Sequence, residues 1–194
     1  MADITGTYEL GPGDGRVLLK TRREGLAARA GHDLTIEITQ WSAQVTVPAA
    51  EEGGIAAATL TAELDLGSLA VREGTGGAKP LSDRDRRDIQ GTARKILGDA
   101  AKASFASSRV VPAPAGSPSA NGAIEGTLTL RGTSRPLRLQ VISPAAGAYR
   151  GSATVRQTDF GITPYSGFFG TLKLKDEIAV EFEVTIKEIP NGSA

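Results

Sequence analysis

The one histidine of this 194-residue chain, His32, is the side chain best suited to proton transfer near neutral pH. It begins the stretch HDLTIEIT, in which apolar and polar residues alternate as in a strand with one buried face. Strand parity places His32 with Leu34, Ile36 and Ile38, and it places the adjacent Asp33 on the opposite face. Asp33 therefore cannot orient the imidazole as the acid of a Ser-His-Asp triad does. We interpret His32 as a polar contact within an apolar interior.

Catalysis is the alternative hypothesis: a hydrolase or isomerase would use His32 as its base, with Asp159 or Tyr165 nearby. No close-spaced set of metal ligands accompanies His32, and the absence of cysteine removes thiolate nucleophiles and cysteine-based zinc sites. The triplet Asp159-Phe160-Gly161 matches the magnesium-binding triplet of protein kinases, but the chain lacks their nucleotide loop and catalytic-loop sequence. We expect no catalytic residue, no metal and no cofactor.

Two other stretches have residues suited to ligand contact. Arg22 and Arg29 lie in TRREGLAARAG, where a guanidinium at the mouth of a barrel could hold a phosphate or carboxylate head group. The alternative is a solvated loop with ordinary surface charge. In GFFG, Phe168 and Phe169 stand between glycines beside Tyr165, and we expect these rings to gate an apolar pocket. Alternatively, one ring packs in the core and the other covers a gap.

Charge and hydropathy exclude several classes of partner. Twenty-two basic side chains balance twenty-two acidic ones, and no basic face is interleaved with aromatic residues, so we expect no nucleic-acid binding. No apolar run is long enough to span a bilayer, so we expect no stable membrane insertion. The N-terminal residues show no secretory signal, which predicts a cytoplasmic protein.

Most of the chain has the period of two that is typical of strands. The clearest segments are 32–39, 59–66 and 175–188, and in the last of these Val180 shares one face with the other apolar residues. Further strands are predicted at 7–10, 16–22, 41–47, 104–111, 123–130, 136–142, 149–157 and 171–175.

One segment follows a helical period instead. In LSDRDRRDIQGTARKILGDA the apolar residues recur near every third or fourth position, and Ser82 with Asp85 resembles a capping arrangement. We predict one α-helix at about 83–97. The segment from Pro112 to Gly122 is predicted to be a flexible surface connection within the domain.

Many short amphipathic strands with one helix predict an all-β fold, a single antiparallel β-barrel of about eight strands closed on itself. A flattened two-sheet sandwich is the alternative. The small aliphatic residues of the inner face favour a cavity, although a packed barrel that binds a protein partner and no ligand is also considered. An exposed edge near the opening could support a homodimer.

Several motifs, in order, resemble the YceI-like family. They are GTYELGPGDGRVLLKT, KASFASSRV, TLTLRGTSRPLRLQV, TVRQTDFGI and LKDEIAVEFEVTI, of which the third is the most similar. The resemblance implies a lipocalin-like barrel over residues 5–188, followed by a C-terminal tail at 189–194. The segments 22–29 and 82–97 depart from the family pattern, and Arg131 stands where many members have histidine.

YceI-like proteins are regarded as polyisoprenoid or lipid binders. The resemblance therefore implies a non-catalytic carrier that holds a long apolar ligand, a polyisoprenoid or a fatty-acid-derived lipid, inside the barrel. Such a tunnel would remove methylenes from water at roughly 0.8 kcal/mol each. We expect Phe168 and Phe169 to form a gate, Arg22 and Arg29 to hold the head group, and His32 to be the internal polar contact. The expected wall consists of Leu34, Ile36, Ile38, Leu64, Val155, Phe160 and Val180.

Overall fold

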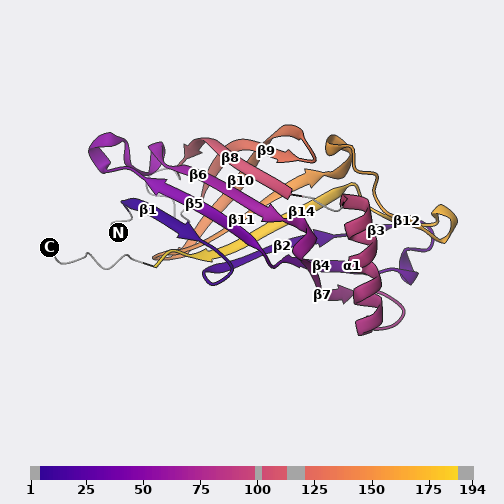
Figure 1. The fold of residues 1–194 in the computed structure, drawn as a ribbon. Helices are drawn as coiled ribbons and strands as arrows, with labels where there is room; N and C mark the ends of the chain where they lie inside the picture. The colour runs from indigo at the N-terminus through magenta and orange to yellow at the C-terminus, as the bar shows by residue number, and fades with distance from the viewer. Residues whose placement is uncertain (1–4, 99–101, 113–120, 188–194) are drawn as a thin grey trace.

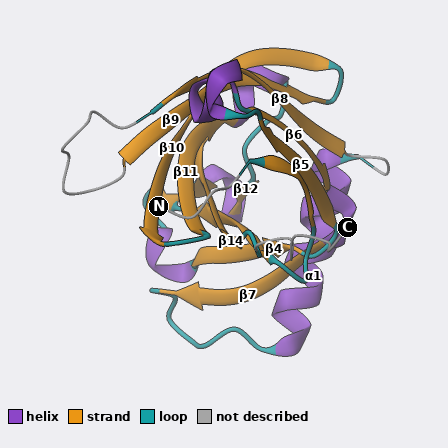
Figure 2. Ribbon diagram, turned by 90° about the vertical axis from the view of Figure 1, so that its left-hand side faces the viewer, coloured by secondary structure: helices purple, strands orange, loops and turns teal. Residues whose placement is uncertain are grey.

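The computed structural model describes residues 5–98, 102–112 and 121–187, and its main feature is one antiparallel sheet that curls around a central space (Figures 1 and 2). Eleven strands form this sheet. In spatial order they are β1 (Gly6–Leu10), β5 (Trp41–Val47), β6 (Thr59–Asp65), β8 (Lys102–Val111), β9 (Asn121–Leu130), β10 (Thr133–Ala145), β11 (Ala148–Arg156), β14 (Glu177–Thr185), β2 (Gly15–Thr21), β4 (Asp33–Ile38) and β7 (Leu69–Thr75).

The sequence alternation is reproduced in the burial of the strands. On β4, Leu34, Ile36 and Ile38 are buried, and Ile38 has no exposed surface. The outer face has cross-strand pairs of opposite charge, such as Arg16 with Glu183 at 2.8 Å. Such exposed pairs contribute little to stability. The concave face therefore supplies most of the folding energy, because it removes apolar side chains from water.

The prediction of a closed barrel of about eight strands is wrong. The sheet has eleven strands, and its end strands β1 and β7 do not pair, so the sheet is a half-barrel. The edge of β7 is covered instead by the helix α1 (Asp83–Leu97). Arg86 donates from Nη1 to the carbonyl oxygens of Val71, at 3.1 Å, and Arg72. A helix that covers an edge strand protects it as closure would.

A second, smaller sheet was not anticipated. It contains β12 (Ser166–Gly167), β13 (Leu172–Leu174) and β3 (Arg23–Glu24). The predicted strand at 171–175 thus exists as β13, but in this small sheet. We call residues 22–30 and 165–175 the tip, because β12 and β3 lie at the end of the molecule opposite the two termini (Figure 1).

The prediction of a helix at 83–97 is confirmed. Ser82 Oγ accepts a hydrogen bond from the Asp85 N–H at 3.2 Å, and Asp85 Oδ2 accepts one from the Ser82 N–H at 2.9 Å. A further bond, from the Ser82 hydroxyl to Asp85, is the main reason why the pKa of Asp85 is lowered. None of the described helices is long and apolar enough to cross a membrane.

Short 3-10 turns connect several strands. They are η1 (Ala28–Ala30), η2 (Ala50–Glu52), η3 (Gly54–Ala57), η4 (Leu66–Ser68), η5 (Gln157–Phe160) and η6 (Phe168–Gly170).

Two predicted segments lie wholly or largely outside the described residues. They are the connection at 112–122, of which positions 113–120 are not described, and the tail at 189–194.

Candidate ligand-binding cavity

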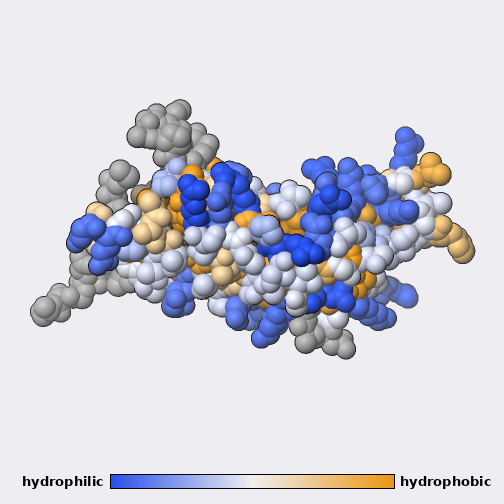
Figure 3. Space-filling model, turned by 90° about the horizontal axis from the view of Figure 1, so that it is seen from above, coloured by the Kyte–Doolittle hydropathy of each residue, from blue (hydrophilic) through white to orange (hydrophobic). Residues whose placement is uncertain are grey.

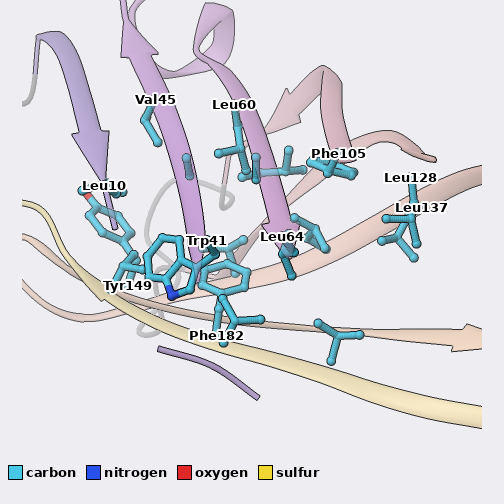
Figure 4. A pocket seen from close by; sticks show the side chains of 18 of the residues that line it. Leu10, Trp41, Val45, Leu60, Leu64, Phe105, Leu128, Leu137, Tyr149 and Phe182 are labelled. Atoms are coloured by element: carbon cyan, nitrogen blue, oxygen red, sulfur yellow. The ribbon is translucent and has the colours of Figure 1, made fainter. Parts of the chain in front are cut away.

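The curled sheet surrounds a cavity of about 1130 Å³. Every strand of the large sheet contributes to its wall, and no charged residue does so among the described residues. Figure 4 shows side chains from opposite sides of the sheet converging on this space. Those labelled there are Leu10, Trp41, Val45, Leu60, Leu64, Phe105, Leu128, Leu137, Tyr149 and Phe182.

The two ends of the cavity differ. At one end, near the termini, the lining includes Ile55 of η3 and Ala145 at the end of β10. At the other end, α1 contributes Ala93, Ile96 and Leu97, which are half-buried and pack against the core. The helix therefore forms part of the cavity wall with an apolar face that has no fully buried residue.

Two polar groups stand out in this apolar lining, the Tyr149 hydroxyl and the indole N–H of Trp41. Neither group has a hydrogen-bond partner among the described residues. Both keep some accessible surface, toward solvent or toward the cavity. Burial raises the pKa of Tyr149, and the nearby Tyr8 raises it further. Tyr149 is therefore a neutral phenol at physiological pH, able to donate or accept a hydrogen bond.

Four residues of the expected wall, Ile36, Leu64, Val155 and Val180, line the cavity. The other three expected wall residues, Leu34, Ile38 and Phe160, are buried in the surrounding core without lining the cavity.

His32 lies away from the cavity. It precedes β4 rather than belonging to it, so strand parity does not carry its side chain inward. Its Nε2 lies 2.7 Å from the carbonyl oxygen of Lys79, and a Cβ at Gly77 would lie 2.1 Å from that nitrogen. No hydrogen bond or ion pair among the described residues joins His32 to Asp159 or Tyr165.

The expected head-group and gate residues lie at the tip. Arg22 and Arg29 are exposed and do not line the cavity. Phe169 is fully exposed, and the side chain of Phe168 lies outside what the structure describes. Tyr165 does line the cavity, with 37 % of its surface exposed.

Arg23, the second arginine of TRREGLAARAG, connects the tip to the large sheet. Its Nη1 donates to the carbonyl oxygens of Gly31 at 2.8 Å and Thr75 at 2.9 Å, and its backbone N–H donates to Asp33 Oδ1 at 2.8 Å. This arginine has a structural role, because its hydrogen bonds fix three chain segments relative to one another.

The aromatic lining residues Trp41, Phe105, Tyr149 and Phe182 were not proposed as ligand contacts from sequence. Strand parity provided a signal for them: Trp41 begins an alternating strand with Ala43 and Val45, which also line the cavity. No group of three or more acidic or histidine side chains in the described part of the chain could hold a metal ion.

A curled antiparallel sheet around a cavity with no charged residue in its described lining defines the class of β half-barrels. The chain belongs to the YceI-like domain family, whose sequence model matches residues 19–186. This match lies within the domain predicted at 5–188. A search of curated proteins found no match.

Two solved structures share the fold. BcnA of Burkholderia cenocepacia has a TM-score of 0.58 and 16% identity, with 88% of this chain and 96% of that chain covered. A mutant YceI protein, designated CJ and made for nanotechnology applications, has a TM-score of 0.50 and 15% identity, with 79% and 85% covered. At these identities the likeness concerns the fold alone.

Proposed function

We propose that this protein is a carrier that binds a long, uncharged apolar molecule, such as an isoprenoid or a fatty-acid derivative, and does not alter it chemically. The observation that carries the proposal is the cavity of about 1130 Å³ with no charged residue in its described lining. Ligand pockets commonly measure roughly 300–1,000 Å³, so this space suits a large or extended ligand. Each methylene moved into it from water contributes roughly 0.8 kcal/mol.

The same lining restricts the chemistry of the ligand. An unpaired charge inside the cavity would lose its hydration without compensation, so a charged head group would have to stay at one end. The Trp41 N–H and the Tyr149 hydroxyl are the groups proposed to bind an uncharged oxygen on the ligand, since neither has a partner among the described residues. Ile36, Leu64, Val155 and Val180 are proposed as apolar wall.

Trp41 makes the proposal directly testable, because it is the only tryptophan in the chain and it lines the cavity. A long-chain fatty alcohol or isoprenoid alcohol titrated into the protein should change Trp41 fluorescence saturably. The same protein, purified without detergent and extracted with organic solvent, should release an apolar molecule detectable by mass spectrometry.

A matched pair of variants separates binding in the cavity from adsorption to the surface. Ala62 lines the cavity, whereas Ala106 on β8 is exposed. Ala62→Phe should weaken binding of the alcohol by at least about tenfold, or about 1.4 kcal/mol. Ala106→Phe should leave it unchanged. Equal binding by both variants, or no saturable change with the wild-type protein, would refute the proposal.

A further inference from the structure

The tip exposes large apolar side chains outside the cavity. Leu26 is 97 % exposed and Phe169 is fully exposed, more than any other large apolar residue of the described chain. Their two loops touch, because Ala27 N–H donates to the carbonyl oxygen of Thr171 at 2.9 Å. Figure 3 shows hydrophobic residues at the right-hand end of the molecule, next to strongly hydrophilic ones. Leu26 and Phe169 therefore lie on two adjoining loops of the tip, and both side chains are exposed.

The backbone at Phe169 favours this exposure. Phe169 has φ 54° and ψ 36°, and Gly170 follows with φ 84°. A bulky side chain rarely occupies the left-handed region, and residues held there cluster at functional sites. The conformation holds the ring away from the core, although an asparagine or glycine would fit the same backbone with less strain.

The tip that exposes these two side chains has an excess of basic residues. The tip has five cations, Arg22, Arg23, Arg29, Lys173 and Lys175, and one carboxylate, Glu24, although the whole chain is neutral.

The small sheet arranges part of this charge on one face. Lys173 pairs in register with Glu24, and the Lys175 N–H donates to the carbonyl oxygen of Arg22 at 2.8 Å. Arg22, Lys173 and Lys175 therefore share a side with the single carboxylate Glu24, and this face keeps an excess of positive charge. In the described structure none of these three, nor Arg29, forms an ion pair. These cations are free to bind an external anion.

We propose that the tip docks onto the surface of an anionic lipid bilayer. Leu26 and Phe169 enter the boundary between head groups and acyl chains, and Arg22, Arg29, Lys173 and Lys175 bind lipid phosphates. Exposed apolar side chains flanked by basic ones are the chemistry that interfacial membrane binding requires. The docking surface stands independently of what the cavity holds.

Docking would also bring one end of the cavity to the bilayer. Tyr165 and Leu174 belong to the tip and line the cavity, and the Leu174 N–H donates to the carbonyl oxygen of Tyr165 at 3.0 Å. Together with the proposed carrier function, this continuity would let an apolar ligand pass between membrane and cavity at Tyr165. That step rests on the proposed function, whereas docking itself does not.

Vesicle sedimentation tests the docking surface. The wild-type protein should bind mixed phosphatidylcholine–phosphatidylglycerol vesicles and should bind pure phosphatidylcholine vesicles more weakly. Leu26→Ser with Phe169→Ser should lower the partition coefficient on the mixed vesicles by about tenfold or more. The control is Ile142→Ser, compared with Phe169→Ser alone, because Ile142 is an exposed apolar residue (42%) outside both the tip and the cavity lining. Ile142→Ser should leave binding near the wild-type value. Unfolding curves check that each variant remains folded.

The charge contribution has its own matched pair. Arg22→Gln, Lys173→Gln and Lys175→Gln together should reduce binding to the mixed vesicles at low salt and have less effect at high salt, where surface charge is screened. Arg84→Gln, Arg87→Gln and Arg109→Gln remove as much charge from exposed positions elsewhere and should leave binding near the wild-type value.

A site-specific label identifies the surface that docks. The chain has no cysteine, so Ser166→Cys and Ala56→Cys each accept one environment-sensitive fluorophore. Addition of mixed vesicles should shift the emission of the label at Ser166→Cys, in the tip, toward the blue and leave the label at Ala56→Cys, in η3, unchanged. No binding by the wild type, or a shift only at Ala56→Cys, would overturn the proposal. Neither result would affect the test of the cavity, which uses no vesicles.

Discussion

The cavity and the tip are both apolar surfaces, but they are opposite in form. The cavity is concave, its described lining has no charged residue, and its side chains project from consecutive strands at the period of two. The tip is convex, it presents Leu26 and Phe169 to solvent, and it has an excess of basic residues. The cavity is suited to removing a single long apolar molecule from water, and the tip is suited to entering the apolar phase of a membrane.

This difference shows that hydrophobic residue type alone does not define a core. Ile38 and Leu26 are both aliphatic, yet Ile38 is fully buried and Leu26 is 97 % exposed. Burial follows from strand parity in the first case, whereas in the second a loop held by Arg23 and by the bond between Ala27 and Thr171 determines exposure.

The largest expected effect on stability comes from placing a charge at residue 38, and the same change at residue 26 is the comparison. Ile38→Asp buries a carboxylate without a partner and should lower the free energy of unfolding by at least about 4 kcal/mol. Leu26→Asp should change it by less than about 0.5 kcal/mol, because residue 26 stays in water. Urea unfolding followed by circular dichroism measures both. Similar losses for the two variants would show that the tip is packed in solution.

Removal of the arginines that attach α1 should open one end of the cavity while leaving the tip unchanged. Arg86 binds carbonyl oxygens on β7, and Arg94 Nε donates to the carbonyl oxygen of Gly67 at 2.9 Å. Arg86→Ala with Arg94→Ala should destabilise the helix locally by about 1–2 kcal/mol.

Hydrogen exchange of the α1 amides measures this change, and exchange in β13 should stay constant. The control is Arg87→Ala, since Arg87 is exposed on the same helix and has no such bond among the described residues. Unchanged exchange in the double variant would mean that apolar packing alone holds the helix.

A pH dependence is expected where the tip joins the large sheet. Asp176 lies between β13 and β14 and accepts hydrogen bonds from Thr158 N–H at 2.8 Å and Thr158 Oγ1 at 2.6 Å, and from Arg156 Nε at 3.3 Å. These bonds, that from the Thr158 side chain first, lower the pKa of Asp176 below its ordinary value of 3.8. The stabilisation is therefore present above about pH 4 and is lost as the pH falls through the lowered pKa.

The comparison of wild type with Asp176→Asn isolates this contribution. The wild type should be the more stable protein near neutral pH, and the difference in unfolding free energy should shrink as the pH falls below about 4. A difference that stays constant over this range would show that the ionised carboxylate is not the stabilising group.

The smallest expected effect on stability is a gain rather than a loss. Phe169→Asn places a residue that tolerates the left-handed backbone at φ 54°, so it should leave stability unchanged or raise it by up to about 1 kcal/mol. The same change should weaken vesicle binding. Thermal unfolding and vesicle sedimentation on one sample test both parts, and a clear loss of stability would indicate that the ring packs against the protein.

Local sequence patterns predicted much of the fold. The helix at 83–97, its cap at Ser82 and most strand positions follow from periodicity and capping chemistry, which involve residues a few positions apart. Four of the seven expected wall residues line the cavity for the same reason. Strand β7 was missed because only Leu69 and Val71 of its seven residues are buried, which leaves too short an alternation to detect.

The sequence by itself determined that the chain forms many amphipathic antiparallel strands with an aliphatic face and one capped helix. The tertiary structure decided that the sheet stays open between β1 and β7 and that His32 turns toward the carbonyl oxygen of Lys79. It also decided that Arg22, Arg29 and Phe169 are all exposed in the tip. The physical reason is distance along the chain. Periodicity and caps act between near neighbours, whereas edge pairing and loop placement depend on contacts between segments far apart in the sequence.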